Sequence, residues 1–339
     1  MKFHAPYIVF ELTQACNLDC RFCYNIWKRP DAPAHEHADW TYAQAKKTLA
    51  RLFKTADVDH VSLTGGEPFL GERMAEIVLY CRMKKKSVSI ISNGTVGNRE
   101  TYRTLISLGV QLFQFPLHSD NPEEHDNMTR TDGSWKKSVE SIKEVQSFGG
   151  LVAAVIVVTK INCASVRRTI ELARKLGIRQ ILLNRMNIGG RAIEQMKEIA
   201  PDRVSLNRAF SEAEVVAARH PDLRISANVC TPQCILDPAR YPHIRFSACA
   251  VSERKMPLTI DASGYVRVCN HSPVVLGNIY SSDLETMLSS SYMREWDTSV
   301  PEFCAGCVKF SACHGGCRAA AEQIGLPLSK PDPVVFYDL

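Results

Sequence analysis

From the N-terminus to about residue 220, short β-rich runs alternate with longer amphipathic stretches, and this alternation restricts the fold more than any other feature. Repeated units of strand and helix form a parallel sheet covered by helices. The candidate strands are residues 7–12, 60–65, 87–94, 110–117, 151–159 and 180–187. Several of the helical stretches between them end in glycine, which suits a left-handed C-cap. Six such units predict an open, partial (β/α)6 barrel that resembles a TIM barrel.

Polar motifs follow the predicted strands. They are the cysteines of CNLDCRFC, then GGEP, SNGT, HSD, TKIN and NIGGR, in chain order. In parallel barrels the chemistry lies at the carboxyl ends of the strands, where loops vary without disturbing the core. We therefore expect these motifs to meet at one rim.

After residue 220 the periodicity is lost, and short apolar pieces are separated by Cys, Pro, Gly and Asn. Such a stretch buries little core for its length, so we expect metal clusters to stabilise it. The predicted organisation is an α/β barrel domain over residues 1–225, followed by a small cysteine-rich auxiliary-cluster domain over residues 226–339.

Composition excludes several classes of protein. No apolar run is long enough to cross a bilayer, and the net charge of +5 is too small to indicate nucleic-acid binding. The N-terminus runs into the first cysteines without a signal-peptide cleavage site, so we expect a cytoplasmic protein with no membrane partner. Thirteen cysteines in a reducing compartment indicate metal sites or catalysis.

The spacing Cys16-x3-Cys20-x2-Cys23 places three thiols on one tight loop. Three thiolates can hold three irons of a 4Fe-4S cluster and leave the fourth iron open to a ligand. An incomplete zinc site or buried structural thiols are the alternatives for such a spacing alone.

This arrangement, with the aromatic Tyr24 after the third cysteine, resembles the signature of the radical S-adenosylmethionine (SAM) superfamily. The resemblance implies that the open iron chelates the amino and carboxylate groups of SAM. One electron then cleaves SAM to methionine and a 5'-deoxyadenosyl radical, which abstracts hydrogen from the substrate.

Further motifs extend the resemblance. Gly65-Gly66-Glu67-Pro68 is similar to the family's second-strand motif, whose backbone accepts the SAM amino group, although such a sequence alone is more often a turn. The resemblance also implies SAM contacts for Ser92 and Asn93 on the third strand. On the sixth strand, the segment with Asn184 is similar to the one that lines the adenine and ribose.

The fourth strand departs from the family, which often has Ser-Leu-Asp-Gly where this chain has Pro116-Leu117-His118-Ser119. We expect Ser119 to replace the SAM-carboxylate contact and Arg130 to be a further carboxylate partner. His118 is a candidate acid or base on the substrate side, although a lone histidine is more often structural.

The C-terminal cysteines resemble the SPASM domain, which holds two auxiliary 4Fe-4S clusters. A zinc ribbon is the alternative for this segment in isolation. The resemblance assigns Cys249, Cys269 and Cys317 to the cluster nearer the active site, and Cys304, Cys307 and Cys313 to the farther one.

The family's final cysteine is missing after Cys317, so each cluster lacks one ligand. Cys230 and Cys234 can supply the missing ligands, because they bring the number of cysteines in this region to eight. Eight thiols are enough for two four-cysteine clusters. We expect Cys234 to complete the near cluster, and Cys230, Asp332 or Asp338 the far one.

For the substrate, the resemblance favours a ribosomally made peptide that is crosslinked, oxidised or epimerised. Only a short segment precedes Cys16, so we expect any leader-peptide-binding domain to be a separate protein. The runner-up is a small molecule such as a tetrapyrrole side chain, a sugar or an alcohol. A non-catalytic electron carrier would not need the polar motifs at the strand ends. A flavodoxin or ferredoxin is the expected electron donor.

Overall fold

The computed structural model describes residues 2–29, 40–252, 255 and 257–336. In these ranges the strands form one sheet with the spatial order β11-β10-β9-β1-β2-β3-β4-β5-β6-β7-β8. The strands are β1 (Phe3–Glu11), β2 (Ala56–Thr64), β3 (Ser87–Ile91), β4 (Val110–Pro116), β5 (Val152–Val158), β6 (Gln180–Arg185), β7 (Arg224–Ala227), β8 (Ile244–Phe246), β9 (Leu258–Asp261), β10 (Tyr265–Arg267) and β11 (Val275–Asn278).

The α-helices are α1 (Tyr42–Thr55), α2 (Met74–Met83), α3 (Arg99–Ser107), α4 (Pro122–Thr129), α5 (Ser134–Ser147), α6 (Val166–Lys175), α7 (Ala192–Ile199), α8 (Arg203–Arg219), α9 (Leu284–Leu288), α10 (Ser291–Thr298), α11 (Phe310–Cys313) and α12 (Arg318–Gln323). Short 3-10 turns are η1 (Ile26–Lys28), η2 (Pro68–Leu70), η3 (Pro238–Arg240), η4 (Glu302–Cys304) and η5 (Pro333–Phe336). None of the described helices is long and apolar enough to cross a membrane.

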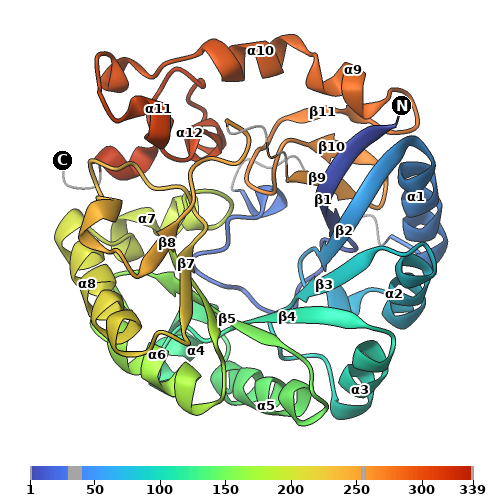
Figure 1. Ribbon diagram of the computed structural model, residues 1–339, viewed down its shortest axis with the longest axis horizontal. Coiled ribbons are helices and arrows are strands. Elements are labelled where there is room, and N and C mark those ends of the chain that lie inside the picture. The colour runs from blue at the N-terminus through green and yellow to red at the C-terminus, as the bar shows by residue number, and fades with distance from the viewer. Residues whose placement is uncertain (1, 30–39, 253–254, 256, 337–339) are drawn as a thin grey trace.

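Strands β1 to β8 pair in chain order, each parallel to the next. The sheet curves around a central space, and the helices that connect the strands lie on its outer side (Figure 1). The six predicted strands correspond to β1 to β6, so the predicted partial barrel is confirmed. The proposed domain boundary at residue 225 falls inside β7, which continues the sheet, and it stays a prediction.

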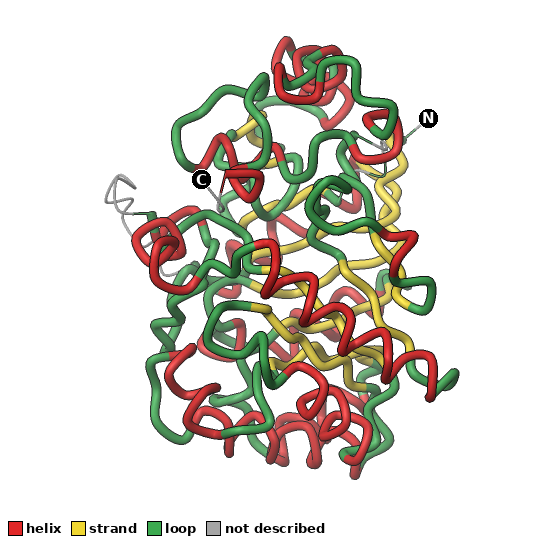
Figure 2. Tube along the Cα trace, turned by 90° about the vertical axis from the view of Figure 1, so that its left-hand side faces the viewer, coloured by secondary structure: helices red, strands yellow, loops and turns green. Residues whose placement is uncertain are grey.

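The C-terminal region joins the same sheet on its other side. Strand β9 pairs parallel with β1, with Ile8 opposite Leu258 and Glu11 opposite Asp261. Strands β10 and β11 then add in antiparallel fashion. Helices α9 and α10 lie above these strands in Figure 1, and α11 and α12 lie to their left. Figure 2 shows the molecule from a second side, with the helices and strands in different colours.

Local sequence explains where the elements begin and end. Helix α1 starts at a capping box in which Thr41 and Gln44 satisfy each other's free backbone N–H groups. Its buried positions Ala45, Leu49 and Leu52 recur at helical spacing and face the sheet. Helix α6 ends before Gly177, whose φ of +84° favours glycine.

Two of the buried clusters support the site. The main core packs the barrel strands against their helices. A smaller core around Trp296, Val268 and Met293 surrounds Cys249 and Cys317.

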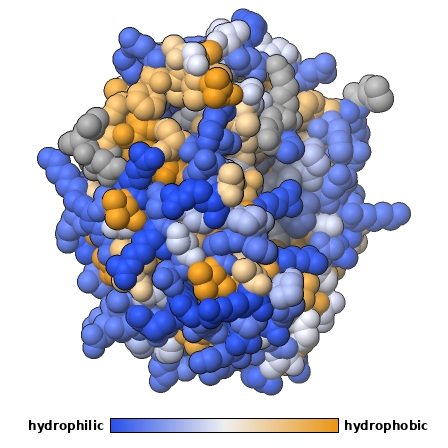
Figure 3. Space-filling view, turned by 60° about the vertical axis from the view of Figure 1, so that its left-hand side comes forward, coloured by the Kyte–Doolittle hydropathy of each residue, from blue (hydrophilic) through white to orange (hydrophobic). Residues whose placement is uncertain are grey.

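On the face drawn in Figure 3, hydrophilic side chains predominate and apolar ones gather toward the top. Phe303 and Val308, beside the last cysteines, are among the exposed apolar residues.

Candidate active site

The first three cysteines lie on the loop between β1 and η1, and backbone hydrogen bonds from the GGEP motif hold that loop. The Gly66 N–H donates to the Thr13 carbonyl at 2.7 Å, and the Glu67 N–H donates to the Ala15 carbonyl at 2.8 Å. Burial raises the pKa of Cys16, Cys20 and Cys23. Positive charge, such as that of cluster irons, is therefore needed to stabilise three thiolates here.

Both glycines of the motif are required by this close packing. A Cβ on Gly65 would lie 2.2 Å from the Thr13 carbonyl oxygen, and one on Gly66 would lie 2.1 Å from the Ala15 carbonyl oxygen. No side chain can be accommodated at such distances from backbone atoms. The motif therefore fixes the cysteine loop as well as lining the cavity beside it.

Glu67 acts through its neighbours rather than at the cavity wall. The buried carboxylate accepts hydrogen bonds from the Ser92 hydroxyl at 2.8 Å and the Asn93 N–H at 2.7 Å. Burial raises its pKa to about 7, although these hydrogen bonds oppose the shift. Glu67 and Pro68 are outside the described cavity lining, whereas Ser92 and Asn93 belong to it. Glu67 therefore positions two residues that line the cavity, and the contact of Glu67 and Pro68 with the cofactor stays a prediction.

His118 lines the cavity and is held by the backbone. Its Nδ1 accepts the Val157 N–H at 3.3 Å, so in the neutral ring the proton is on Nε2. Its ring stacks on that of His125 with a centroid distance of 5.1 Å. Burial, followed by the neighbouring His125, lowers the pKa of His118 well below its usual value. His118 is therefore a neutral hydrogen-bond donor, and its role as acid or base stays a prediction.

Ser119 and Arg130 are not brought to the cavity in the described part of the chain. The Ser119 hydroxyl donates to Glu124 at 2.5 Å and is fully buried. Arg130 follows α4 and pairs with Asp19 at 3.3 Å. The loop after β4 turns Ser119 toward α4 and α6. The SAM-carboxylate contacts of Ser119 and Arg130 stay predictions.

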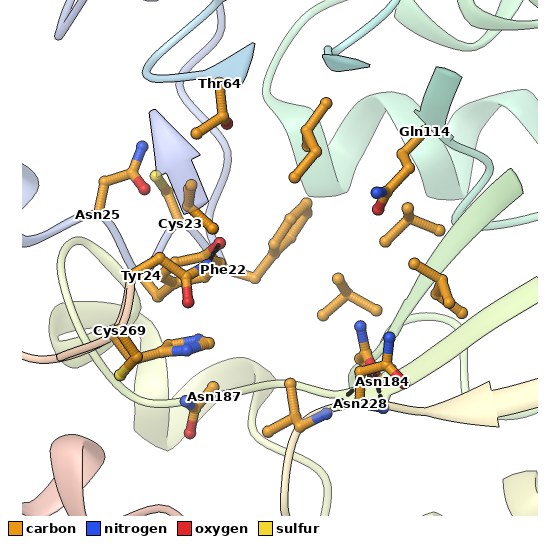
Figure 4. Close-up of a pocket in the computed structure, with 18 of the residues that line it drawn as sticks. Phe22, Cys23, Tyr24, Asn25, Thr64, Gln114, Asn184, Asn187, Asn228 and Cys269 are labelled. Atoms are coloured by element: carbon orange, nitrogen blue, oxygen red, sulfur yellow. Dashed lines mark hydrogen bonds between the residues drawn. The ribbon is translucent and has the colours of Figure 1, made fainter. Parts of the chain in front are cut away.

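Asn184 on β6 does line the cavity, as predicted. Its Oδ1 accepts the N–H groups of Asn228 at 2.8 Å and Val229 at 3.2 Å (Figure 4). The side chain therefore fixes the path of the chain after β7. Its contact with SAM stays a prediction.

Four cysteines meet beside β6 and form what we call the near group: Cys230, Cys249, Cys269 and Cys317. Hydrogen bonds with Cys249 and Cys317 raise the pKa of Cys230 well above its usual value. Burial, and then Cys317 and Cys249, raise that of Cys269 to about 12. Cys249 and Cys317 are only 7% and 6% exposed, and Cys230 and Cys269 are half-buried, so this group lies below the surface, beside the cavity.

The other four form what we call the far group: Cys234, Cys304, Cys307 and Cys313. Burial, and then the neighbouring Cys313 and Cys307, raise the pKa of Cys234. The pKa of Cys304 is raised to about 11, first by burial and then by Cys313, Cys234 and Cys307. Cys234 and Cys307 are exposed, so this group lies at the surface.

The two remaining cysteines lie in the opposite groups to those expected from the sequence. Cys230 lies in the near group and Cys234 in the far group. Asp332 is buried in an ion pair with Arg185. Asp338 lies outside the described residues. Only three residues separate the two cysteines, so the path of the chain between them decides which group each one joins. Which side chains bind each cluster stays a prediction.

The donors fit iron–sulfur clusters better than single ions. The described cysteines are all free thiols. In the same residues, no three Cys, His, Asp or Glu side chains are close enough to share one metal ion. A cluster needs its thiolates farther apart than one ion does, and it is ligated by cysteine. One group of three and two groups of four thiols match that requirement.

A single cavity of about 820 Å³ connects the first cysteines to the near group. Its lining includes Cys16, Cys20 and Cys23 and all four near-group cysteines. Figure 4 shows Cys23 and Cys269 on one side of this space, and Gln114 and Asn184 across from them. A substrate in the cavity would have access to both thiol sites.

Sequence reasoning missed several cavity residues. The Asn270 amide donates to the Tyr24 hydroxyl at 2.7 Å, and His271 packs on the Tyr24 ring at a centroid distance of 4.0 Å. Arg185 also lines the cavity, as does Asn187, the first residue of the NIGGR motif that was expected at this rim. The position of Asn270 and His271 directly after Cys269 was the available signal.

Comparison with known proteins decides the family. The profile of the radical SAM superfamily matches residues 10–162, and that of the SPASM iron–sulfur cluster-binding domain matches residues 249–308. The chain belongs to the radical SAM superfamily. It is a radical SAM enzyme that uses SAM and an iron–sulfur cluster, and its SPASM region binds auxiliary iron–sulfur clusters.

Several related proteins can be aligned with almost the whole length of this radical SAM enzyme. The antilisterial bacteriocin subtilosin biosynthesis protein AlbA of Bacillus subtilis is 28% identical over 331 residues, covering 94% of this chain and 67% of AlbA. Mycofactocin maturase MftC of Mycolicibacterium smegmatis is 26% identical over 349 residues, covering 96% and 81%. Streptococcus suis SuiB, in a crystal structure with its precursor peptide SuiA, has the same fold with a TM-score of 0.73 at 16% identity, covering 98% and 76%.

Proposed function

We propose that this enzyme modifies a ribosomally made peptide by crosslinking, oxidation or epimerisation. The observation that carries the proposal is the single cavity whose lining includes both a three-thiol site and a four-thiol site. A residue of a peptide can enter such a cavity while the rest of the chain stays outside.

Different residues of the cavity would hold the cluster and SAM. Cys16, Cys20 and Cys23 would hold the cluster that binds SAM, and together these supply the 5'-deoxyadenosyl radical. Ser92, Asn93 and Asn184, with the backbone of Gly65 and Gly66, would hold SAM against it. The buried Glu67 keeps Ser92 and Asn93 in place.

The cavity walls suit a peptide residue. Apolar side chains of β4 to β6, such as Val155 and Leu182, line the interior beside the amide of Gln114. Apolar walls with a few polar groups bind and orient a side chain while excluding water. His118 would offer its Nε2–H to an acceptor on SAM or on the substrate.

The near and far groups would each hold one 4Fe-4S cluster, with four cysteine ligands apiece. The far group lies at the surface and the near group lies below it, beside the cavity. A flavodoxin or ferredoxin would supply the electron, and a separate leader-peptide-binding protein would deliver the substrate. The names of AlbA and MftC, and the peptide bound to SuiB, support a peptide substrate.

The test is co-expression with each short peptide encoded beside the gene, in deuterated water and at low oxygen, followed by mass spectrometry. Loss of two hydrogens would indicate a crosslink or oxidation, and gain of one deuterium would indicate epimerisation. The Cys16→Ala/Cys20→Ala/Cys23→Ala variant is the control and should leave every peptide unchanged. Unmodified peptides with intact clusters would refute the proposal in favour of a small-molecule substrate.

A further inference from the structure

Hydrogen bonds form a closed ring around Cys317, one ligand of the near group. The Cys317 N–H donates to Asp332 at 2.8 Å, and Asp332 pairs with Arg185. Arg185 donates to the Asn187 Oδ1 at 3.2 Å. The Asn187 amide then donates to the Cys317 sulfur at 3.3 Å, which completes the ring.

The orientation of the Asn187 amide is fixed by chemistry. A guanidinium can only donate, so the oxygen of Asn187 must face Arg185. The amide nitrogen is then left pointing at the Cys317 sulfur, the other polar atom within reach. The reversed orientation would place two donors against each other and leave the sulfur facing an oxygen.

Arg185 in turn has little freedom to move. Besides Asp332, it donates to the Cys230 carbonyl at 3.1 Å and to the Thr231 hydroxyl at 3.1 Å. It therefore joins the end of β6 to the backbone of a second near-group cysteine. Arg185 and Asp332 are fully buried or nearly so, and Asn187 is 4% exposed. In such surroundings water does not weaken the polar contacts.

The reduction potential of an iron–sulfur cluster depends on net charge, solvent exposure and hydrogen bonds to its sulfurs. The charges of Arg185 and Asp332 offset each other, so this pair adds no net charge beside the cluster. The remaining influence of the ring is the hydrogen bond that the Asn187 amide donates to the Cys317 sulfur. A donor at a thiolate sulfur withdraws electron density and stabilises the reduced state.

We propose that Asn187 raises the reduction potential of the cluster held by the near group, with Arg185 and Asp332 as positioning residues. The inference rests on the proposed near-group ligands and not on the identity of the substrate. It makes the end of β6, which lines the cavity, part of the auxiliary site. Figure 4 shows Asn187 on the side of the cavity where Cys269 lies.

The test is a potentiometric titration of the reconstituted enzyme, followed by electron paramagnetic resonance. The near-group component is the one missing from the Cys230→Ala variant. We expect Asn187→Leu, which removes the donor, to shift this component to lower potential. Asn187→Asp, which places an oxygen against the sulfur, should shift it further. The other components should not move.

Asn228→Leu is the matched control, because it removes an amide from the same cavity wall, and that side chain donates to no cysteine sulfur among the described residues. It should leave the near-group potential unchanged. Equal potentials in wild type and both Asn187 variants, or a common shift of all components, would overturn the proposal. So would loss of about four irons from both variants, because the contact would then hold the cluster instead of tuning it. The assay contains no peptide, so its result is independent of the peptide proposal.

Discussion

The loop that carries the first three cysteines and the region that carries the last eight are built in different ways. Cys16, Cys20 and Cys23 lie on one short segment, which backbone hydrogen bonds attach to the end of β2. The near group instead collects Cys230, Cys249, Cys269 and Cys317 from separate parts of the C-terminal chain. A local site can leave one iron open without losing its shape. A cluster bound at a site assembled from distant segments would also help to join those segments.

The strongest test of this comparison removes the local site. The Cys16→Ala/Cys20→Ala/Cys23→Ala variant should lose all SAM cleavage while both auxiliary clusters remain. Iron should fall from about twelve to about eight per chain, at four per cluster. Measurements are iron content and 5'-deoxyadenosine formation by the reduced enzyme. Continued cleavage would contradict the assignment of the SAM-binding cluster.

The next test separates the two auxiliary groups. Cys230→Ala should remove the near-group cluster and Cys234→Ala the surface one, with about four irons lost in each case. We expect the first variant to unfold at a much lower temperature, because the smaller core packs around near-group cysteines. Iron analysis and a thermal melt check both outcomes. The same spectroscopic component missing from both variants would contradict the division into two groups.

A smaller perturbation addresses how the loop is held. Gly66→Ala would press a methyl group against the Ala15 carbonyl and displace the cysteine loop, at a cost of about 1–3 kcal/mol. We expect weaker SAM binding and incomplete loading of the SAM cluster, with the auxiliary clusters intact. Gly133→Ala is the control for a general loss of stability, because a Cβ there meets nothing within 4 Å while the φ of +78° still strains the backbone, away from the cysteine loop. Equal SAM affinity in both variants would show that the close approach is not needed.

The two regions also differed in how far their sequence predicted them. The first six parallel strands, β1 to β6, were found because their alternation with helices is a local signal. Strands β7 to β11 were not found, since each is short and β9 pairs with β1 across most of the chain. The near and far cysteines could be identified from spacing, but the choice between Cys230 and Cys234 depended on tertiary structure. The NIGGR motif placed Asn187 at the rim but did not predict its contact with Cys317, because an asparagine at a strand end is also an ordinary loop residue.

The finest test lies where the two regions join, at the pairing of β1 with β9. Burial, together with the nearby Glu11, raises the pKa of Asp261 to about 6. The folded protein therefore binds this proton more tightly than the unfolded chain does. The stabilisation is complete below about pH 4, the pKa of an unfolded Asp, and is lost as the pH rises through about 6.

Asp261→Asn should remove this dependence, because the amide stays neutral and its oxygen can still accept the Tyr265 N–H. We expect the variant to melt a few degrees higher than the wild type at pH 7.5, and the difference to shrink toward pH 5. Thermal melts of the cluster-loaded protein across this range provide the measurement. A constant difference at every pH would mean that the carboxylate is already ionised in the fold, and that the junction tolerates its charge beside Glu11.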